Sequence, residues 1–253
     1  MRLLLPPSET KRDGGADAAL DLNALSFPVL TMARAATTAA VAELALQPAE
    51  MMRALKLGPR QAHEVDRNRD LLGSPTMPAL DRYTGVLFDA LDAPTLDAEA
   101  RAYAATHVVV HSALFGLLGA MDPIPAYRLS HDSRLPAVRL KALWRDPIAT
   151  ALESERGVIL DLRSEAYVDL GPAPARVDTA FVRVVSVDGS GRRRALNHFN
   201  KRAKGLFTRA VLVARPRIDS IGELIDWAHE AGFSLALSPV RDDSSVRELE
   251  LVA

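Results

Sequence analysis

The chain begins with a short apolar run that ends at two consecutive prolines. Leu3–Leu5 precede Pro6-Pro7, and a polar stretch from Ser8 to Arg12 follows. Proline lacks the backbone N–H that a sheet ladder needs and forces the preceding residue into an extended conformation, so a strand must end here. Ligands of α/β proteins bind preferentially at the carboxyl ends of strands. We therefore predict a core strand followed by a binding loop; the alternative is a solvated turn.

Helical and strand patterns alternate along the rest of the chain. The 3.6-residue periodicity predicts helices over residues 31–46, 48–55, 60–70, 96–105, 137–152, 200–214 and 218–231. Strand patterns cover residues 108–110, 157–162, 177–187, 193–199, 233–237 and 247–252. Residues 113–118 fit either pattern, and Asp188–Gly191 predict a hairpin turn. We expect a mixed α/β (α+β) fold in one compact domain over residues 1–253, with a mixed sheet flanked by helices and a helical part at about residues 31–72.

The composition excludes several classes of protein and site. The chain has no cysteine, so disulfides, cysteine-ligated metals and a thiol nucleophile are excluded. The formal net charge of −1 gives no global field toward nucleic acid or membrane. No apolar run reaches the roughly 20 residues of a membrane helix, and Pro6-Pro7 interrupt the apolar N-terminus before it resembles a signal peptide. We expect a cytoplasmic protein with no membrane partner.

Known nucleotide, hydrolase and zinc motifs are also absent from the sequence. There is no Walker A loop, no G-x-G-x-x-G fingerprint and no G-x-S-x-G elbow. His63-Glu64 lacks the second histidine of a zinc-binding helix. We therefore expect no cofactor and no metal site.

A second polar cluster follows a second apolar strand. Residues 157–162 lead directly into Arg163, Ser164, Glu165 and Tyr167. These side chains are expected at the same sheet edge as the Ser8–Lys11 loop, where two polar strand ends would form a pocket. The alternative is an ordinary helix capped by Ser164.

A third cluster is basic. From Arg183 to Arg209 there are eight basic residues and one acidic residue, a local net charge of +7. On a helix, Lys201, Lys204 and Thr208 would share one polar face, opposite the apolar residues that face the core. This segment indicates an anionic partner such as a phosphate or a nucleic-acid backbone. Equally, it fits a solvated basic face balanced by the acidic residues near the C-terminus.

A tight turn joins two helical segments at residues 54–62. Gly58-Pro59 separates Lys56 from Arg60, and Ala62 is small enough for close helix packing. This pattern partly resembles a helix-hairpin-helix DNA-binding element, which offers N–H groups at a helix N-terminus to a phosphate. Lys56 stands where that element has its first glycine, and a generic helical hairpin explains the pattern equally well.

Seven motifs occur in a fixed order from Arg2 to about Val240. They are Pro6-Pro7-Ser8-Glu9-Thr10-Lys11, Tyr83-Thr84-Gly85, Leu114–Leu118 with Asp122, Tyr127-Arg128-Leu129, Leu143–Asp146, Leu162–Tyr167 and Asn200–Leu206. The ordered series resembles the YaaA family of peroxide stress proteins. This resemblance implies a cytoplasmic protein of mixed α/β fold that limits free intracellular iron. It also implies DNA binding through a helix-hairpin-helix region and a positively charged cleft.

Two motifs depart from the usual family pattern. The family often has Ser-Pro-Ala-Lys-Thr at the opening, whereas Glu9 here occupies the lysine position and Lys11 follows Thr10. The segment Lys201-Arg202-Ala203-Lys204-Gly205 replaces Lys-Lys-Ala-Arg-Gly, which keeps the charge but changes its geometry. The role of Lys11 is therefore open.

Two functional hypotheses follow, and a third assigns the protein no chemistry. In the first, a stress-response protein binds DNA or another polyanion in a basic cleft. Its binding residues would be Ser8, Lys11, Arg128, Arg163, Ser164, Lys201, Arg202, Lys204, Lys56 and Arg60. In the second, an enzyme acts on a phosphorylated or nucleotide-like small molecule. The third is a binding scaffold without chemistry, which predicts an exposed apolar patch.

The enzyme hypothesis makes a geometric prediction. Lys11, Arg163 and Lys201 would hold the anion, and Glu165 or Tyr167 would supply acid–base function, with Lys11 itself a further catalytic candidate. All five side chains should then lie in one pocket.

Overall fold

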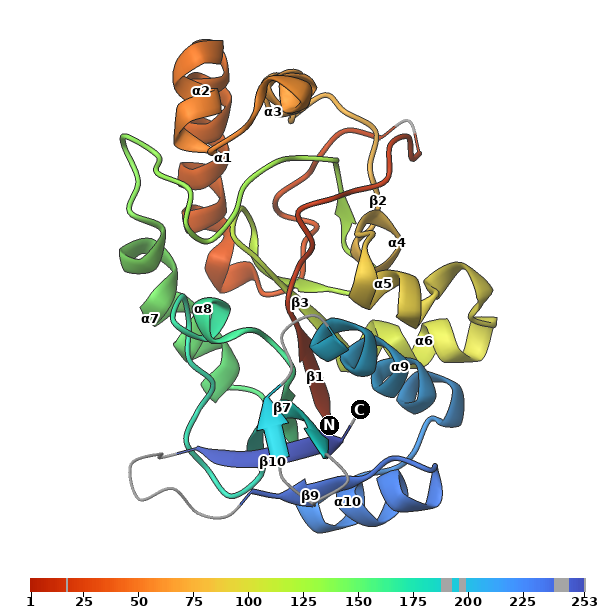
Figure 1. The fold of residues 1–253 in the computed structure, drawn as a ribbon. Helices are drawn as coiled ribbons and strands as arrows, with labels where there is room; N and C mark the ends of the chain where they lie inside the picture. The colour runs from red at the N-terminus through yellow and green to blue at the C-terminus, as the bar shows by residue number, and fades with distance from the viewer. Residues whose placement is uncertain (17, 188–192, 196–198, 239–245, 253) are drawn as a thin grey trace.

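A computed structural model describes residues 1–16, 18–187, 193–195, 199–238 and 246–252 of the chain. Within these residues, eight strands form one sheet, in the order β4-β3-β1-β6-β7-β10-β9, with β8 paired to the end of β7 (Figure 1). The strands are β1 (Arg2–Leu5), β3 (Val108–Ser112), β4 (Gly116–Gly119), β6 (Ile159–Asp161), β7 (Thr179–Val187), β8 (Arg193–Ala195), β9 (Leu235–Leu237) and β10 (Arg247–Val252). A separate pair is formed by β2 (Met77–Pro78) and β5 (Pro123–Ile124).

The centre of the sheet is parallel and its outer strands are antiparallel. β1 runs parallel to both neighbours, with Leu3 opposite Val108 of β3 and Leu4 opposite Asp161 of β6. β6, β7 and β10 continue the parallel part, whereas β4, β8 and β9 pair antiparallel. The mixed sheet is confirmed. Because β1 and β6 run in the same direction, the segments after Leu5 and Asp161 leave the sheet at the same edge.

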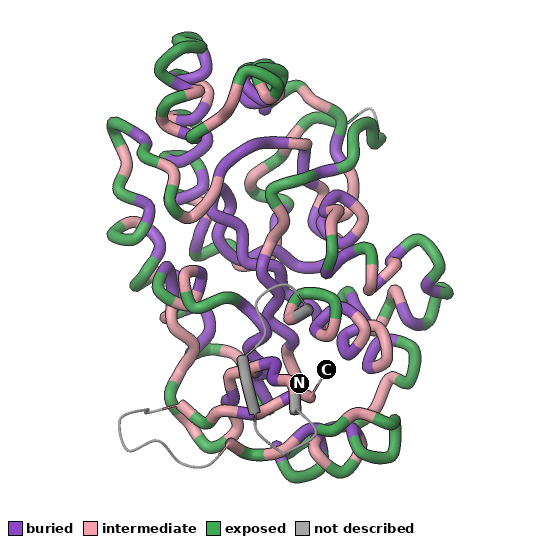
Figure 2. The backbone as a smooth tube through the Cα atoms, in the orientation of Figure 1, coloured by how far each residue is buried: buried purple, intermediate pink, exposed green. Residues whose placement is uncertain are grey.

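Helices cover both sides of β1. They are α1 (Thr31–Ala45), α2 (Pro48–Ala54), α3 (His63–Arg69), α4 (Ala79–Arg82), α5 (Val86–Leu91), α6 (Ala98–His107), α7 (Leu140–Glu153), α8 (Glu165–Val168), α9 (Phe199–Ala214) and α10 (Ile221–Glu230). Short 3₁₀ turns occur at Pro28–Leu30, Pro59–Gln61 and Ala93–Thr95. In Figure 1, α5, α6 and α9 lie to the right of β1, α7 and α8 to its left, and α1 to α3 at the top. The buried backbone concentrates between these groups, along the central strands (Figure 2).

The ambiguous segment at residues 113–118 is a tight turn followed by β4. Gly116 has a φ of +66°, and a Cβ there would lie 2.8 Å from the Trp144 ring. Buried Arg34 of α1 donates to the Phe115 carbonyl at 2.8 Å, and the Trp144 indole donates to the Ala113 carbonyl at 2.9 Å. The turn is therefore fixed by side chains of α1 and α7, which a local sequence pattern does not contain.

Two expectations about the segment around α9 require correction. Phe199 belongs to α9 and not to a return strand, because it continues the helical spacing of Ala203 and Phe207. Lys204 and Thr208 are buried on α9 and do not share an exposed face with Lys201. Lys204 contacts the Arg163 carbonyl after β6 and lies 5.4 Å from the Phe181 ring of β7, so this end of the sheet covers its side of α9. The expected hairpin turn at residues 188–191 lies outside the described residues.

Replacing Gly205 with alanine should destabilise the protein. A Cβ at this position would lie 2.2 Å from the Leu87 carbonyl oxygen of α5, a backbone atom that cannot rotate away. We expect Gly205→Ala to lower the free energy of unfolding by about 1–3 kcal/mol in urea denaturation. Gly222→Ala in α10 is the matched control, because its nearest neighbour is the Ser220 hydroxyl at 3.8 Å. The control should be neutral or stabilising by up to about 1 kcal/mol; equal effects would contradict the close contact.

Candidate functional site

A cavity of about 430 Å³ lies at the carboxyl ends of β1 and β6, beside the first turn of α9. We call it the carboxyl-edge pocket. Its lining residues are Pro6, Pro7, Ser8, Glu9, Thr10, Leu129, Ser130, His131, Leu162, Ser164, Tyr167, Asn200, Lys201 and Lys204. The volume is in the range of small-molecule sites. All three polar clusters identified in the sequence contribute to it.

The Ser8–Lys11 loop is held by the Tyr-Thr-Gly motif. Lys11 forms an antiparallel bridge with Tyr83, and the Thr84 N–H donates to the Thr10 carbonyl at 3.2 Å. Gly85 has a φ of +94°, and a Cβ there would lie 3.1 Å from the Ser8 hydroxyl. Ser8 and Thr10 hydroxyls are themselves 3.2 Å apart. The motif therefore presents two hydroxyl groups to the pocket on a supported loop.

Lys11 lies behind this loop and does not line the carboxyl-edge pocket. Its Nζ donates to the carbonyls of Ser8 at 2.9 Å and Glu9 at 3.3 Å, and it lies 4.0 Å from the centre of the Tyr127 ring. The Tyr127 hydroxyl is hydrogen-bonded to Tyr83 at 2.7 Å. Burial lowers the pKa of Lys11 to about 7. Two carbonyls and the faces of two rings, Tyr127 and Tyr83, thus engage the amine, which supports the loop from beneath.

The buried amine of Lys11 gives the protein a specific pH dependence. The folded pKa of about 7 lies below the value of about 10.4 in an unfolded chain. Between these values the unfolded chain binds more protons, so the free energy of unfolding rises with pH. We expect the free energy of unfolding of the wild type, relative to that of Lys11→Met, to increase by up to about 1.4 kcal/mol per pH unit in this window. Urea denaturation from pH 6 to pH 10 measures the gain, and parallel curves would contradict it.

Arg128 acts on the pocket through Glu9. Its guanidinium forms an ion pair with the Glu9 carboxylate. The backbone of Arg128 is held by Asn68, whose side-chain amide exchanges two hydrogen bonds with it, at 2.7 and 2.8 Å. Arg128 is nearly buried and is not a lining residue. The structure thus places it as the partner that fixes the orientation of Glu9.

Arg163 is buried under the pocket. It donates to both carboxylate oxygens of Asp161, at 2.6 and 2.8 Å, and to the carbonyl of Gly171 at 2.8 Å. A further bond of 2.8 Å reaches His111 Nδ1, which must accept, so the His111 proton is on Nε2. Burial and the charge of Arg163 lower the pKa of His111 well below its usual value. The expectation that Arg163 contacts the anion directly is not met, because Asp161 occupies its guanidinium.

Tyr167 and Glu165 face different cavities. Tyr167 lines the carboxyl-edge pocket, packs edge-on against His111 and lies 5.4 Å from the His131 ring. Burial raises the pKa of its phenol well above the usual value. Glu165 is exposed, pairs with Arg183 at 3.2 Å and lines a neighbouring cavity of about 310 Å³. The single pocket that the enzyme hypothesis predicted for five residues therefore contains Tyr167 and Lys201 only.

The first turns of α9 bring two lysines to the pocket. Lys201 is exposed at its rim, Lys204 is buried in its wall, and Arg202 is exposed outside it. Part of the basic segment is compensated elsewhere, since Arg183 pairs with Glu248 at 2.7 Å and Arg209 with Asp92 at 3.7 Å. A continuous basic cleft is not seen among the described residues. The lysines and arginines that line the carboxyl-edge pocket are Lys201 and Lys204.

The connection between α2 and α3 does not contribute to the pocket. Lys56 has a φ of +54°, pairs with Asp132 and is exposed, as is Arg60. The two helices that flank this connection have seven residues each. The helix-hairpin-helix element is not shown.

Sequence reasoning missed three polar lining residues, Ser130, His131 and Asn200. His131 belongs to a loop with no regular structure, whose polar residues carried no pattern. Asn200 was assigned to the helix, and its position at the start of α9 next to the strand ends was the available signal. Its Oδ1 is buried without a hydrogen-bond partner among the described residues.

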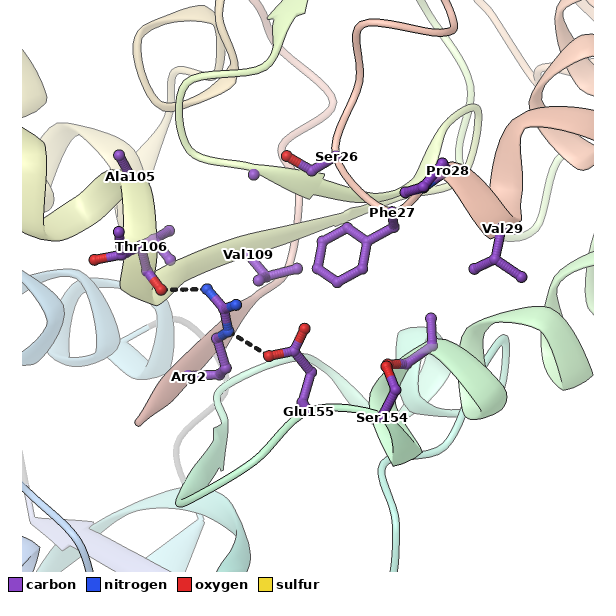
Figure 3. A pocket seen from close by; sticks show the side chains of 13 residues that line it. Arg2, Ser26, Phe27, Pro28, Val29, Ala105, Thr106, Val109, Ser154 and Glu155 are labelled. Carbon is purple, nitrogen blue, oxygen red and sulfur yellow. Dashed lines mark hydrogen bonds and ion pairs between the residues drawn. The ribbon is translucent and has the colours of Figure 1, made fainter.

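A second cavity, of about 540 Å³, lies at the amino ends of β1 and β3 (Figure 3). Arg2 crosses it to pair with Glu155 and to donate to the Thr106 carbonyl. The apolar residues Phe27, Val29 and Val109 form much of the rest. Its two charged groups neutralise each other, so it offers less to an anionic ligand than the carboxyl-edge pocket does.

Two further kinds of site are absent from the described part of the chain. There, no group of three or more His, Asp or Glu side chains is placed to hold a metal ion. No helix of these residues has both the length and the apolar character needed to cross a bilayer.

Comparisons with known proteins match nearly the whole chain. A family model described as peroxide stress protein YaaA matches residues 1–237. The chain belongs to the YaaA family. A UPF0246 protein of Corynebacterium efficiens is 40% identical over 249 residues, covering 96% of this chain and 98% of that protein. A UPF0246 protein of Streptomyces coelicolor is 39% identical over 243 residues, covering 93% and 92%. YaaA family membership is consistent with a role in the stress response.

Proposed function

We propose that the carboxyl-edge pocket of this YaaA family protein binds a phosphate-bearing ligand. The observation that carries the proposal is the meeting of Lys201 and Lys204 with the hydroxyls of Ser8, Thr10 and Ser164 around one cavity. Ammonium groups and hydroxyls are the usual donors to phosphate oxygens. The N-terminal turn of α9 adds a favourable partial charge, because helix N-termini attract anions.

Glu9 limits where an anion can bind. Its carboxylate belongs to the lining, but Arg128 neutralises it. The phosphate is therefore proposed to lie on the side of Lys201 and Ser164, with the remainder of the ligand toward Tyr167 and His131. These two rings, together with Leu129 and Leu162, supply the apolar surface that a sugar or base needs.

The phosphate can belong to a polynucleotide or to a free nucleotide. DNA binding, which the family resemblance implies, would place one backbone phosphate at Lys201, with the exposed Arg202 near the adjacent backbone. A free nucleotide would bind the same donors, so both sources share one recognition chemistry.

Binding measurements on the full chain distinguish these sources. Adenosine monophosphate, adenosine and a short DNA duplex are titrated at several salt concentrations. We expect the monophosphate to bind and adenosine to bind at least tenfold more weakly. If DNA is the ligand, the logarithm of its affinity should fall with the logarithm of salt by about 0.9 for each phosphate contacted. Absence of binding by both phosphate-bearing probes at low salt would refute the proposal.

The cellular role is proposed from the family. Membership among peroxide stress proteins supports a contribution of this pocket to peroxide resistance. The limitation of free intracellular iron in the cytoplasm, implied by the resemblance, would be its consequence. Electron paramagnetic resonance of free iron in peroxide-treated cells tests this role. Wild type should lower the signal in a deletion strain, and Lys201→Ala should not; equal restoration by both would separate the pocket from the phenotype.

A further inference from the structure

Lys204 is the one lysine in the wall of the carboxyl-edge pocket that is buried there. Its side chain comes from the second turn of α9, one helical turn after the exposed Lys201. Among the described residues, the Nζ of Lys204 has one hydrogen-bond acceptor, the Arg163 carbonyl at 3.3 Å. Lys204 is also one of the residues that line the cavity.

The other buried lysine provides a direct contrast. Lys11 contacts two carbonyls and the face of Tyr127, and it does not line the pocket. Its amine is fully engaged, as in a structural lysine. Lys204 has a long contact to one carbonyl and lies 5.4 Å from the Phe181 ring. Lys204 therefore belongs to the wall that a ligand would contact, whereas Lys11 does not.

The surroundings of Lys204 increase the fraction of its amine that is uncharged. Burial lowers its pKa to about 8, with Asp161 opposing this effect and Arg183 adding to it. An amine with this pKa is partly unprotonated near neutral pH, and the unprotonated amine is the nucleophile. Desolvated lysines next to cationic groups form Schiff bases with carbonyl compounds for this reason.

We propose that Lys204 forms an imine with a phosphate-bearing aldehyde or ketone bound in the carboxyl-edge pocket. The amine nitrogen adds to the carbonyl carbon, and the carbonyl oxygen takes a proton to give a carbinolamine. Loss of the hydroxyl group as water, with the second proton of the amine nitrogen, leaves the imine. The overall step consumes one amine and one carbonyl group and releases one water. It rests on the proposed function, because Lys201 would hold the phosphate.

Tyr167 is the lining group placed to supply protons. Its phenol stays protonated because burial raises its pKa. It lines the same pocket as Lys204, so it can donate to the departing oxygen. His131 lies beside Tyr167 and lines the same pocket.

Reductive trapping tests the inference on the full chain. Glyceraldehyde 3-phosphate is added with sodium cyanoborohydride, which delivers hydride to an imine and leaves a stable secondary amine. The protein has five lysines, so peptide mass spectrometry assigns the adduct unambiguously. We expect the adduct on Lys204, at a rate at least tenfold above that on Lys11, Lys56 or Lys141. The rate should rise as the pH increases through the range of the lowered pKa.

Variants distinguish the nucleophilic amine of Lys204 from its positive charge. Lys204→Arg keeps a cation but cannot form an imine, so the adduct should be lost. Lys141→Arg, a change at an exposed residue of α7 outside the pocket, should leave it unchanged. Should Lys204→Arg fail to fold, the wild-type adduct site still decides. Trapping only at other lysines, or none, would overturn the inference.

Two parallel measurements keep this inference distinct from the proposed function. Binding of adenosine monophosphate without an adduct on Lys204 would refute imine formation and leave phosphate binding intact. Glyceraldehyde without phosphate should react at least tenfold more slowly. An equal rate for both aldehydes would overturn the assignment to a phosphate-bearing substrate.

Discussion

Replacing Arg163 with methionine should lower the free energy of unfolding by about 3–5 kcal/mol. The substitution leaves the Asp161 carboxylate, which is buried to 2% exposure, without its partner. It also removes the donor to His111 Nδ1 and to the Gly171 carbonyl. A buried charge that loses its hydrogen-bonded counter-ion is left with an uncompensated desolvation cost. Urea denaturation at pH 7 measures the loss.

Two further variants test whether the loss of stability comes from the buried Asp161–Arg163 pair. Lys141→Met removes one partner of an exposed ion pair, Lys141–Asp169, and should cost no more than about 1 kcal/mol. The double variant Asp161→Leu with Arg163→Met removes both charges and should recover part of the stability. A loss below about 1 kcal/mol for Arg163→Met would mean that the pair is not buried as described.

Replacing Lys201 with alanine should weaken the binding of adenosine monophosphate ten- to one-hundredfold. A hydrogen bond to a charged group contributes about 1.5–3 kcal/mol, and 1.4 kcal/mol corresponds to a factor of ten. Arg202→Ala is the matched control, because it removes the same charge from the adjacent position of α9 but outside the pocket. Its effect should stay below about threefold, since exposed charges are screened.

Comparing the two variants separates a direct contact with Lys201 from the effect of overall positive charge. Equal weakening by Lys201→Ala and Arg202→Ala would show that the ligand responds to overall charge and not to the pocket. Isothermal titration calorimetry gives both affinities, and unchanged unfolding curves establish that neither variant alters the fold.

The meeting of the strand ends was predictable from sequence. Pro6-Pro7 fixes the end of one strand, and the polar run after Asp161 marks the end of another. Parallel neighbours in a sheet end at one edge, so a pocket between them follows once the two strands are paired. The register of Leu4 opposite Asp161 provides the observed geometry.

The separation of Glu165 from Tyr167 follows from helical geometry. Both lie in α8, and residues two apart on a helix point about 200° from each other. The sequence prediction placed both residues in one cluster and did not apply this spacing, although Ser164 indicated that a helix begins there. Arg163 carried a signal as well, because Asp161 two residues earlier faces the same side of an extended segment.

The burial of Lys204 could not be predicted from its own segment. Lys201 and Lys204 look alike on a helical wheel, and the contacts that distinguish them, with the Arg163 carbonyl and the Phe181 ring, come from distant parts of the chain. The same holds for Lys11, whose pairing with Tyr83 and Tyr127 joins parts of the chain far apart in sequence. Contacts of this kind depend on the complete fold.

A crystal structure of the protein with adenosine monophosphate tests the central claim most directly. We predict the phosphate in the carboxyl-edge pocket, with oxygens about 3 Å from Lys201 Nζ and from the hydroxyl of Ser8 or Ser164. A phosphate bound instead between α2 and α3, at Lys56 and Arg60, would contradict the claim and assign the anion site to the helical part of the chain.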